Sequence, residues 1–527
     1  MSSSATRLCF LILKERYGEV VASVACCLAK KNYCPLRMLS QDSGLKLDQV
    51  KKALCTLIQH NLVTFQQNKK GFIEYVIHAE KVLQQTRFPR YIYCAKTLYG
   101  DPAELIIEEL LQHGQMTLEK VVQRTIDRLT EAMEGKQNVS STLVKEKFVN
   151  LVQTHFVQRC TSPDGNVENK EVASMPVLSV SPEELYVVPK MELDGFESRK
   201  RKRSGEGSEA ASKRIKTDES ESSESSIFWR VNVSRFHQYL RDQAIVQAVA
   251  SKIDKNAAEV VRAMLRLSEV KTDEGALVAS AMTVTEVFQN LPREFGISKQ
   301  TIEQYMKLLS EDSSEFVSKV SDSGGGMYVI NFKKLITVLC RAHIESAVQE
   351  RFGSKCFRIF RLLLMKKNLE QKQIEEYAMI PSKEAKELLY RMFEEKFVSL
   401  TEVPKTPDHA PSRTFYLFSV NINQVSRMLL ERCYQACGNL IIRREHETKE
   451  NRRLLDKQQR VDAITASMEQ SGADPSQKEE IEQMITPPEK AQLTKIKHMT
   501  NKIEHSELQL DDTIFILQTY LQYAHMK

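Results

Sequence analysis

The sequence predicts a mainly α-helical protein with small β-hairpin wings, because one pattern of apolar residues occurs four times along its 527 residues. In each copy an amphipathic helix leads into a short strand, and a polar turn joins this strand to a second strand that contains a tyrosine. The first, second and fourth copies share the same apolar spacing, whereas the third has three extra residues before its first strand. This order of elements is typical of a winged helix, so we predict four winged helices in tandem.

The four hairpins are expected within residues 63–76, 157–188, 317–330 and 398–418. In the second copy, the returning strand is expected at 185–188, where Tyr186 lies between apolar residues. In the third copy, the turn contains Gly324, Gly325 and Gly326. These glycines precede a strand rather than a helix N-terminus, so they indicate a hairpin turn and not a phosphate-binding loop.

Further helices are expected upstream of each wing, one more than a minimal winged helix needs, which indicates the extended form of the fold. Their predicted ranges are 7–17, 19–30 and 35–42 in the first copy, 102–112 and 117–131 in the second, 232–251, 257–267 and 283–290 in the third, and 334–351, 355–366 and 371–377 in the fourth. Gly44 and Gly114 end two of these helices, since glycine readily adopts the backbone conformation that follows a helix C-terminus.

Strand signals stop after Val420, and two long helices are predicted at 424–470 and 488–523. Glycine and proline residues separate these helices, which favours an antiparallel hairpin. Seven apolar residues of the second helix recur at coiled-coil-like spacing. They are Ile496, Met499, Ile503, Leu510, Ile514, Leu517 and Leu521. The almost wholly charged segment 443–453 indicates that part of the first helix is exposed or faces a partner.

These elements predict the domain boundaries. The winged helices are expected at 1–85, 86–191, 227–332 and 333–422, and the C-terminal coiled-coil hairpin at 423–527. Residues 192–226, between the second and third winged helices, are rich in Ser, Glu, Lys and Arg. Such a composition buries too little apolar surface to fold, so this segment is predicted to be a disordered charged linker.

Two basic clusters in this linker resemble a bipartite nuclear localisation signal, which predicts a nuclear protein. The clusters consist of Arg199, Lys200, Arg201, Lys202, Arg203, Lys213, Arg214 and Lys216. The alternative is a solvated linker whose charges serve solubility alone.

The composition restricts the class of protein further. The net charge of +6 is compatible with nucleic-acid binding but is too small to indicate a dedicated duplex-binding protein. The eleven cysteines include no CxxC pair, which favours a reducing compartment. No apolar run is long enough to cross a bilayer, and charged residues interrupt the N-terminal apolar segment, so neither a membrane span nor a signal peptide is predicted.

No enzyme signature is found, because the sequence lacks GxxxxGK[ST], GxGxxG, HExxH and GxSxG. Cys433 and Cys437 lie four residues apart on a predicted helix and could share a metal ion, but no second pair of ligands has a fitting spacing. We therefore predict that these cysteines pack in the core. We predict no catalysis, no metal, no cofactor and no small-molecule substrate.

What remains is recognition of nucleic acid or protein. Lys51 and Lys52 begin the exposed side of the last helix of the first copy, and Lys69 and Lys70 lie at the tip of its wing, where ammonium groups can reach DNA phosphates. For this copy, contact with DNA and contact with protein remain open. In the fourth copy, acidic residues offset the basic ones, so protein contact is favoured there. The acidic residues are Glu384, Glu387, Glu394 and Glu395, against Lys383, Lys386 and Arg391.

Several longer strings resemble one subunit family of DNA-directed RNA polymerase III. The strings lie at 47–54, 57–63, 88–92, 108–111, 154–160 and 229–232. The family is the extended-winged-helix member of the polymerase-specific heterotrimer and is similar to the large subunit of general transcription factor E. The resemblance covers essentially the whole chain.

The resemblance implies a nuclear, non-catalytic subunit on the polymerase clamp that helps to load the initiation factor, to open promoter DNA and to hold the open complex. It implies contacts with the other two heterotrimer subunits, with the clamp of the largest subunit, and with single-stranded or double-stranded DNA. The complex makes transfer RNA, 5S ribosomal RNA and other short transcripts, and takes part in cytosolic DNA sensing in animals.

Two alternatives belong to other classes of protein. A free-standing DNA-binding transcription factor would need a strongly basic recognition helix, and the sequence contains none. A scaffold of the proteasome-lid or signalosome type would carry a single terminal winged helix rather than four.

Overall fold

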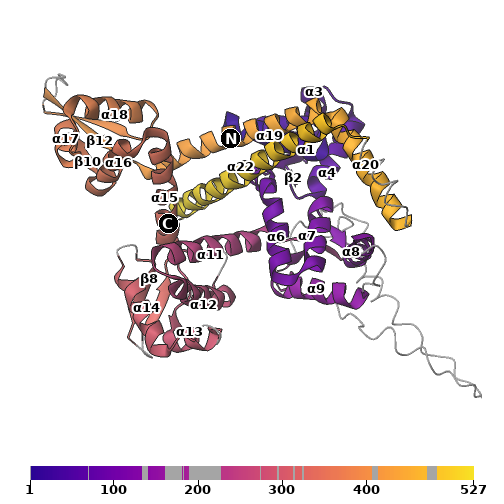
Figure 1. Cartoon of the computed structure of the whole chain (residues 1–527), viewed down its shortest axis with the longest axis horizontal. Coiled ribbons are helices and arrows are strands. Elements are labelled where there is room, and N and C mark those ends of the chain that lie inside the picture. The colour runs from indigo at the N-terminus through magenta and orange to yellow at the C-terminus, as the bar shows by residue number, and fades with distance from the viewer. Residues whose placement is uncertain are drawn as a thin grey trace, which may run out of the picture. The chain divides into compact units, whose positions relative to one another are not determined.

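The computed structural model describes residues 2–31, 33–68, 71–132, 140–160, 181, 183–188, 227–272, 275–292, 296–312, 315–322, 326–405, 413–471 and 484–526. The chain forms two compact units, one made of Cys9–Leu240 and the other of Ser2–Leu8 with Arg241–Lys527. Both are mainly helical and contain small antiparallel sheets, which confirms the predicted fold class (Figure 1).

The first two winged helices are joined by a short helical connection. The first consists of α1 (Ser3–Tyr17), α2 (Glu19–Lys31), β1 (Cys34–Pro35), α3 (Leu36–Ser43), α4 (Leu47–Gln59), β2 (Val63–Gln67) and β3 (Ile73–Ile77). The connection consists of α5 (Ala79–Leu83) and the 3-10 helix η1 (Gln84–Arg87). The second winged helix consists of α6 (Phe88–Tyr99), α7 (Asp101–His113), β4 (Met116–Thr117), α8 (Leu118–Ala132), α9 (Ser141–Gln153), β5 (Val157–Cys160) and β6 (Phe228–Val231).

The third and fourth winged helices repeat this order of elements. The third consists of α11 (Val233–Lys252), α12 (Lys255–Lys271), β7 (Met282–Thr283), α13 (Val284–Asn290), α14 (Lys299–Glu311), β8 (Val317–Ser321) and β9 (Met327–Ile330). The fourth consists of α15 (Phe332–Phe352), α16 (Ser354–Lys366), β10 (Asn368–Glu370), α17 (Gln371–Ala378), α18 (Ser382–Glu394), β11 (Ser399–Pro404) and β12 (Thr414–Ser419). The predicted helices upstream of each wing are therefore confirmed, with ends shifted by a few residues.

The shared apolar spacing has a structural cause at the turn between helix and wing. In the first, second and fourth copies, the second residue after the helix has a positive φ. The backbone N–H of the residue that follows it donates to a carbonyl five residues earlier. These hydrogen bonds join Leu62 to Leu57, Phe156 to Leu151 and Phe397 to Met392, each at 2.9 Å, after Asn61 (φ 55°), His155 (φ 65°) and Lys396 (φ 63°). This closure returns the chain over the helix and buries the next apolar residue.

Each of the four sheets has three strands, and the returning strand of the wing lies in the middle. The orders are β1-β3-β2, β4-β6-β5, β7-β9-β8 and β10-β12-β11. The outer strands β1, β4, β7 and β10 were not predicted, because strands of two or three residues are too short to show an alternation of apolar and polar residues. Pro35 was expected to begin a helix. It lies instead in β1, where it pairs with Glu74 of β3, and α3 begins at the next residue.

The predicted returning strand of the second wing is wrong. Residues 185–188 contain no strand, and their link to β5 is one backbone hydrogen bond from Arg159 N–H to the Leu185 carbonyl at 2.9 Å. The strand that pairs with β5 along its whole length is β6, which follows the charged segment. The segment predicted to separate the second and third winged helices therefore lies inside the second one, between two strands of its sheet.

The C-terminal part forms the predicted antiparallel hairpin, in which α19 (Ile422–Glu450) packs along α22 (Pro487–His525) (Figure 1). Hydrogen bonds join Asn423 to Tyr520, Tyr434 to Gln518 and Arg444 to Glu507, so the two helices run in opposite directions. All seven residues of the predicted apolar stripe are buried or half-buried. The first helix is not continuous, because Asn451 separates α19 from α20 (Arg452–Ser471).

Candidate nucleic-acid interface

The helix α4 presents one apolar and one polar face. Its side chains at Val50, Ala53, Leu54 and Leu57 recur at helical spacing and are buried beneath the helix. Lys51 and Lys52 lie on the other side and are exposed, as predicted. Neither lysine forms an ion pair with a residue that the structure describes, so both ammonium groups are available to an external anion.

The described part of the wing of the first winged helix carries exposed apolar side chains. Lys69 and Lys70 lie outside the described residues. On either side of them, the Asn68 amide donates to the Glu74 carboxylate at 2.7 Å, and Phe72 is 64% exposed. An exposed aromatic ring suits a nucleic-acid base as well as a protein surface, so the described part of the wing leaves both partners possible.

The second winged helix covers the C-terminal end of α4. The Gln59 side-chain amide donates to the carbonyl of His113 at 2.9 Å, and the backbone of Gly114 lies directly beside that of Gln59. A groove of about 420 Å3 runs between Lys51 and Leu54 on one side and Phe228 on the other. A DNA major groove cannot receive the whole of α4 in this arrangement, so its exposed lysines are suited to phosphates rather than to base edges.

The corresponding helix of the fourth winged helix has a different surface. The acidic side chains expected to offset its cations are partly engaged, because Glu384 pairs with Lys355 and Glu395 pairs with both Arg351 and Arg432. Tyr390 and Phe393 on α18 are 48% and 41% exposed. Aromatic side chains among paired charges are typical of a protein-binding surface.

The described parts of the chain show neither a metal-binding cluster nor a membrane-spanning helix. Cys433 and Cys437 are buried, and burial raises the pKa of their thiols to about 11 and about 12. This confirms the predicted core packing. No cluster of metal-binding side chains occurs among the described residues, and none of the described helices is both long and apolar enough to span a membrane. All eight residues of the predicted nuclear localisation signal lie outside the described residues.

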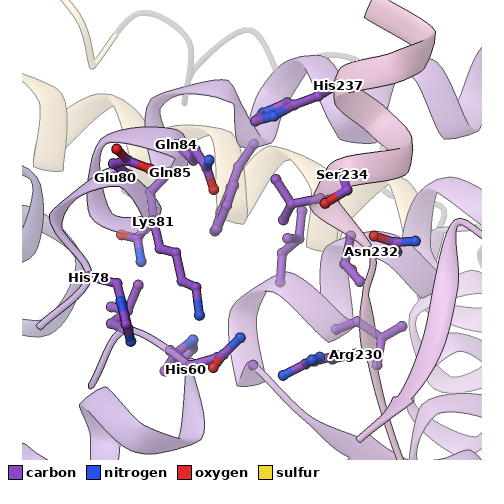
Figure 2. A pocket seen from close by; sticks show the side chains of 18 of the residues that line it. His60, His78, Glu80, Lys81, Gln84, Gln85, Arg230, Asn232, Ser234 and His237 are labelled. Atoms are coloured by element: carbon purple, nitrogen blue, oxygen red, sulfur yellow. The ribbon is translucent and has the colours of Figure 1, made fainter. Parts of the chain in front are cut away.

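Sequence reasoning missed two cations that the fold brings together. Lys81 of α5 and Arg230 of β6 reach into one cavity between the first and second winged helices (Figure 2). No local pattern marks this pair, because Arg230 approaches only when β6 completes the second sheet. The prediction of 185–188 as the returning strand left Arg230 outside the second sheet.

Comparison with known families agrees with this architecture. Four family models match the chain: the RNA polymerase III subunit RPC82 helix-turn-helix domain at 7–68, RNA polymerase III subunit RPC82 at 146–339, the POLR3C C-terminal winged-helix domain at 344–420, and the helical hairpin domain of DNA-directed RNA polymerase III subunit RPC3 at 453–516. The first match falls on the first winged helix and the third on the fourth winged helix, whereas the RPC82 match runs from α9 to α15 and the hairpin match covers α20 and most of α22.

Relatives from several vertebrates match this chain over nearly their whole length. DNA-directed RNA polymerase III subunit RPC3 is 51% identical in Bos taurus and 50% identical in Homo sapiens, over 99% of this chain and 99% of each relative. The Danio rerio protein of the same name is 47% identical over the same shares. These names agree with the prediction of an accessory polymerase subunit rather than a stand-alone enzyme. The chain belongs to the RPC3 subunit family of DNA-directed RNA polymerase III.

Proposed function

We propose that this chain supports transcription initiation and promoter opening by RNA polymerase III as a peripheral, non-catalytic subunit. The observation that carries the proposal is the pair of exposed lysines, Lys51 and Lys52, with no ionic partner among the described residues, on a winged helix of a polymerase III subunit. Cations in such a position contact DNA phosphates, which fixes a protein on the strand without reading its sequence. The partners proposed are DNA, the other two heterotrimer subunits, the clamp and the initiation factor.

The first and fourth winged helices have different roles in this proposal. The first winged helix contacts DNA through Lys51, Lys52, Lys69 and Lys70, because the two lysines that the structure describes, Lys51 and Lys52, are exposed and form no ion pair with a described residue. The fourth contacts protein, because its α18 surface combines exposed aromatic rings with paired charges. This division explains how one chain could hold DNA while remaining attached to the polymerase.

Reversing the four lysines to glutamate is expected to weaken DNA binding and promoter opening. Each lost contact with a duplex phosphate should reduce the slope of log affinity against log salt concentration by about 0.9. Polymerase III carrying the variant subunit should initiate poorly on closed duplex promoters and normally on templates that are already melted. The measurements are a salt series of binding affinities and transcription from the two kinds of template.

A matched variant reverses Lys372, Lys383, Lys386 and Lys396, which are exposed on the fourth winged helix. It carries the same change in net charge, and its salt dependence of DNA binding should equal that of the wild-type chain. Stability should change by no more than about 0.5 kcal/mol for each exposed substitution. Equal salt slopes for the wild-type chain and the first variant would show that this face contacts something other than DNA.

We further propose that the basic clusters at 199–203 and 213–216 direct the chain to the nucleus, where RNA polymerase III works. Replacing Arg199, Lys200, Arg201, Lys202 and Arg203 with alanine should leave a tagged chain partly cytoplasmic, because import receptors bind such cations through acidic surfaces. The measurement is the nuclear fraction of fluorescence in living cells. An unchanged nuclear fraction would remove this assignment.

A further inference from the structure

A cavity of about 680 Å3 lies between the first and second winged helices, within the unit Cys9–Leu240 (Figure 2). One wall is formed by the end of α4, the end of β3 and the α5–η1 connection, and the other by α7, β5, β6 and the start of α11. The cavity is therefore built from segments that are far apart in the sequence and exists only when both winged helices have folded.

Two cations converge on this cavity without a carboxylate between them. Figure 2 shows Lys81 reaching in from α5 and Arg230 from β6, while the carboxylate of Glu80 lies at the edge, away from the Lys81 ammonium group. Neither cation forms an ion pair with a residue that the structure describes. The Gln158 side chain, with its amide oxygen turned toward Arg230, accepts hydrogen bonds from the guanidinium at 3.0 and 3.2 Å and fixes its direction.

Among the groups that line the cavity, only the Glu80 carboxylate at its edge carries a negative charge. The pKa of Lys81 lies below its ordinary value, because burial disfavours the ammonium form and because Arg230 adds a second positive charge nearby. The pKa of His60 falls to about 4 and that of His78 is also lowered, in both cases mainly through burial, so these imidazoles are neutral at pH 7. An anion that entered the cavity would relieve the repulsion between the two cations.

The rest of the lining suits more than a bare anion. Phe88, Leu110 and Leu111 supply apolar surface, and the imidazoles and the Gln84 amide supply hydrogen-bonding groups. The ring of His60 is held against Tyr17 with centroids 4.7 Å apart, and His78 contacts the Thr64 hydroxyl at 2.9 Å. A nucleotide combines these requirements, since its phosphate is anionic, its base has apolar faces and its base edges form hydrogen bonds.

We propose that this cavity binds one nucleotide of a single-stranded nucleic acid, with its phosphate between Lys81 and Arg230. A duplex is too wide to enter a recess between two winged helices, whereas an unpaired nucleotide can turn into it. An acidic protein side chain would use the two charges but leave the aromatic and amide lining without contacts. The inference rests on the proposed DNA contact and extends it to a second place on the same chain.

The test measures binding of a short fluorescein-labelled oligothymidylate to the full-length chain. Replacing Lys81 and Arg230 together with glutamine should weaken binding roughly tenfold, as expected for the loss of a charge-assisted hydrogen bond. The slope of log affinity against log salt concentration should fall by about 0.7, the value for one phosphate of a single strand. The control replaces the exposed Lys372 and Lys383 with glutamine and should bind as tightly as the wild-type chain.

A second measurement uses the wild-type chain alone, so it does not depend on how a variant folds. Acetylation of lysines followed by mass spectrometry should show that oligothymidylate protects Lys81 and leaves Lys372 as reactive as before. Equal reactivity of Lys81 with and without the oligonucleotide would overturn the proposal. So would protection of Lys81 by polyglutamate but not by oligothymidylate, since that result assigns the cavity to an acidic protein segment.

The outcomes also separate this proposal from the proposed function. If the wild-type chain binds oligothymidylate and only reversal of Lys51, Lys52, Lys69 and Lys70 weakens binding, the cavity proposal fails and the DNA contact of the first winged helix stands. If the wild-type chain binds neither single-stranded nor duplex DNA, both fail together.

Discussion

Replacing Trp229 with alanine is expected to lower the free energy of unfolding of the second winged helix by about 3–5 kcal/mol, the usual cost of removing a large buried aromatic side chain. Trp229 has no exposed surface, and its ring packs perpendicular to that of Phe148 with centroids 5.3 Å apart. It lies in β6, the middle strand of its sheet, and pairs there with Arg159 of β5. The cavity left behind would therefore loosen both the helix beneath and the strands alongside.

Hydrogen exchange of the β5 amides is the measurement of choice, because it reports on this sheet while the other winged helices remain folded. The exchange of the Gln158 and Cys160 amides, which alternate with the Arg159 N–H that donates to Leu185, should accelerate strongly in the variant. Replacing Phe72, which is 64% exposed, with alanine removes another aromatic ring and should change stability by no more than about 0.5 kcal/mol. Unchanged protection of β5 would contradict the assignment of β6 as the strand that completes this sheet.

Replacing Gly114 with alanine is expected to cost about 2–6 kcal/mol, the sum of backbone strain and overpacking. Gly114 has a φ of +77°, and a Cβ at this position would lie 2.6 Å from the backbone carbonyl oxygen of Gln59. The opposing atom belongs to the backbone of α4, so it cannot turn aside as a flexible side chain can. The two winged helices would have to separate, and the hydrogen bond from the Gln59 amide to His113 would be lost.

Gly44 provides the matched control, because its φ is +65° and no atom lies within 4 Å of a Cβ built there. Its replacement with alanine should cost only the strain of the left-handed conformation, about 1–2 kcal/mol. The fluorescence of Trp229, the one tryptophan of the chain, reports unfolding of the second winged helix as urea is added. Equal midpoints for the two variants would show that the close approach to Gln59 does not hold these modules together.

The repeated modules were predictable because their signal is local. The apolar spacing from Leu54 to Val63 reflects one helix, one left-handed residue and one strand, and these interactions span few residues. The same spacing identified the fourth copy, and the glycine-containing turn helped to identify the third. The outer strand of each sheet was missed because a strand of two or three residues leaves no alternating pattern.

The second wing could not be assigned in the same way. Residues 185–188 carry the tyrosine-containing apolar pattern expected of a returning strand, and hairpin strands are normally joined by loops much shorter than the one that precedes β6. Phe228, Trp229 and Val231 do carry the aromatic and β-branched character of a strand, and Trp229 and Val231 alternate toward the core. This strand signal is present in the sequence, but its pairing with β5 is concealed because the two strands are far apart along the chain.

In the candidate interfaces, too, local features were predictable and features formed by packing between modules were not. The exposure of Lys51 and Lys52 follows from the helical periodicity of their buried neighbours and was predictable. The covering of α4 by the second winged helix and the meeting of Lys81 with Arg230 depend on tertiary packing between modules, which no periodicity within one module encodes.

The placement of the charged segment between β5 and β6 determines what happens when the chain is cut. A protease that cleaves between residues 161 and 226 severs the polypeptide but not the β5–β6 ladder, so the two pieces would remain associated as a noncovalent pair until that sheet melts. A fragment that ends before residue 227 would lack the middle strand between β4 and β5, and a fragment that begins there would expose Trp229 to water. Neither fragment alone contains the complete sheet of the second winged helix.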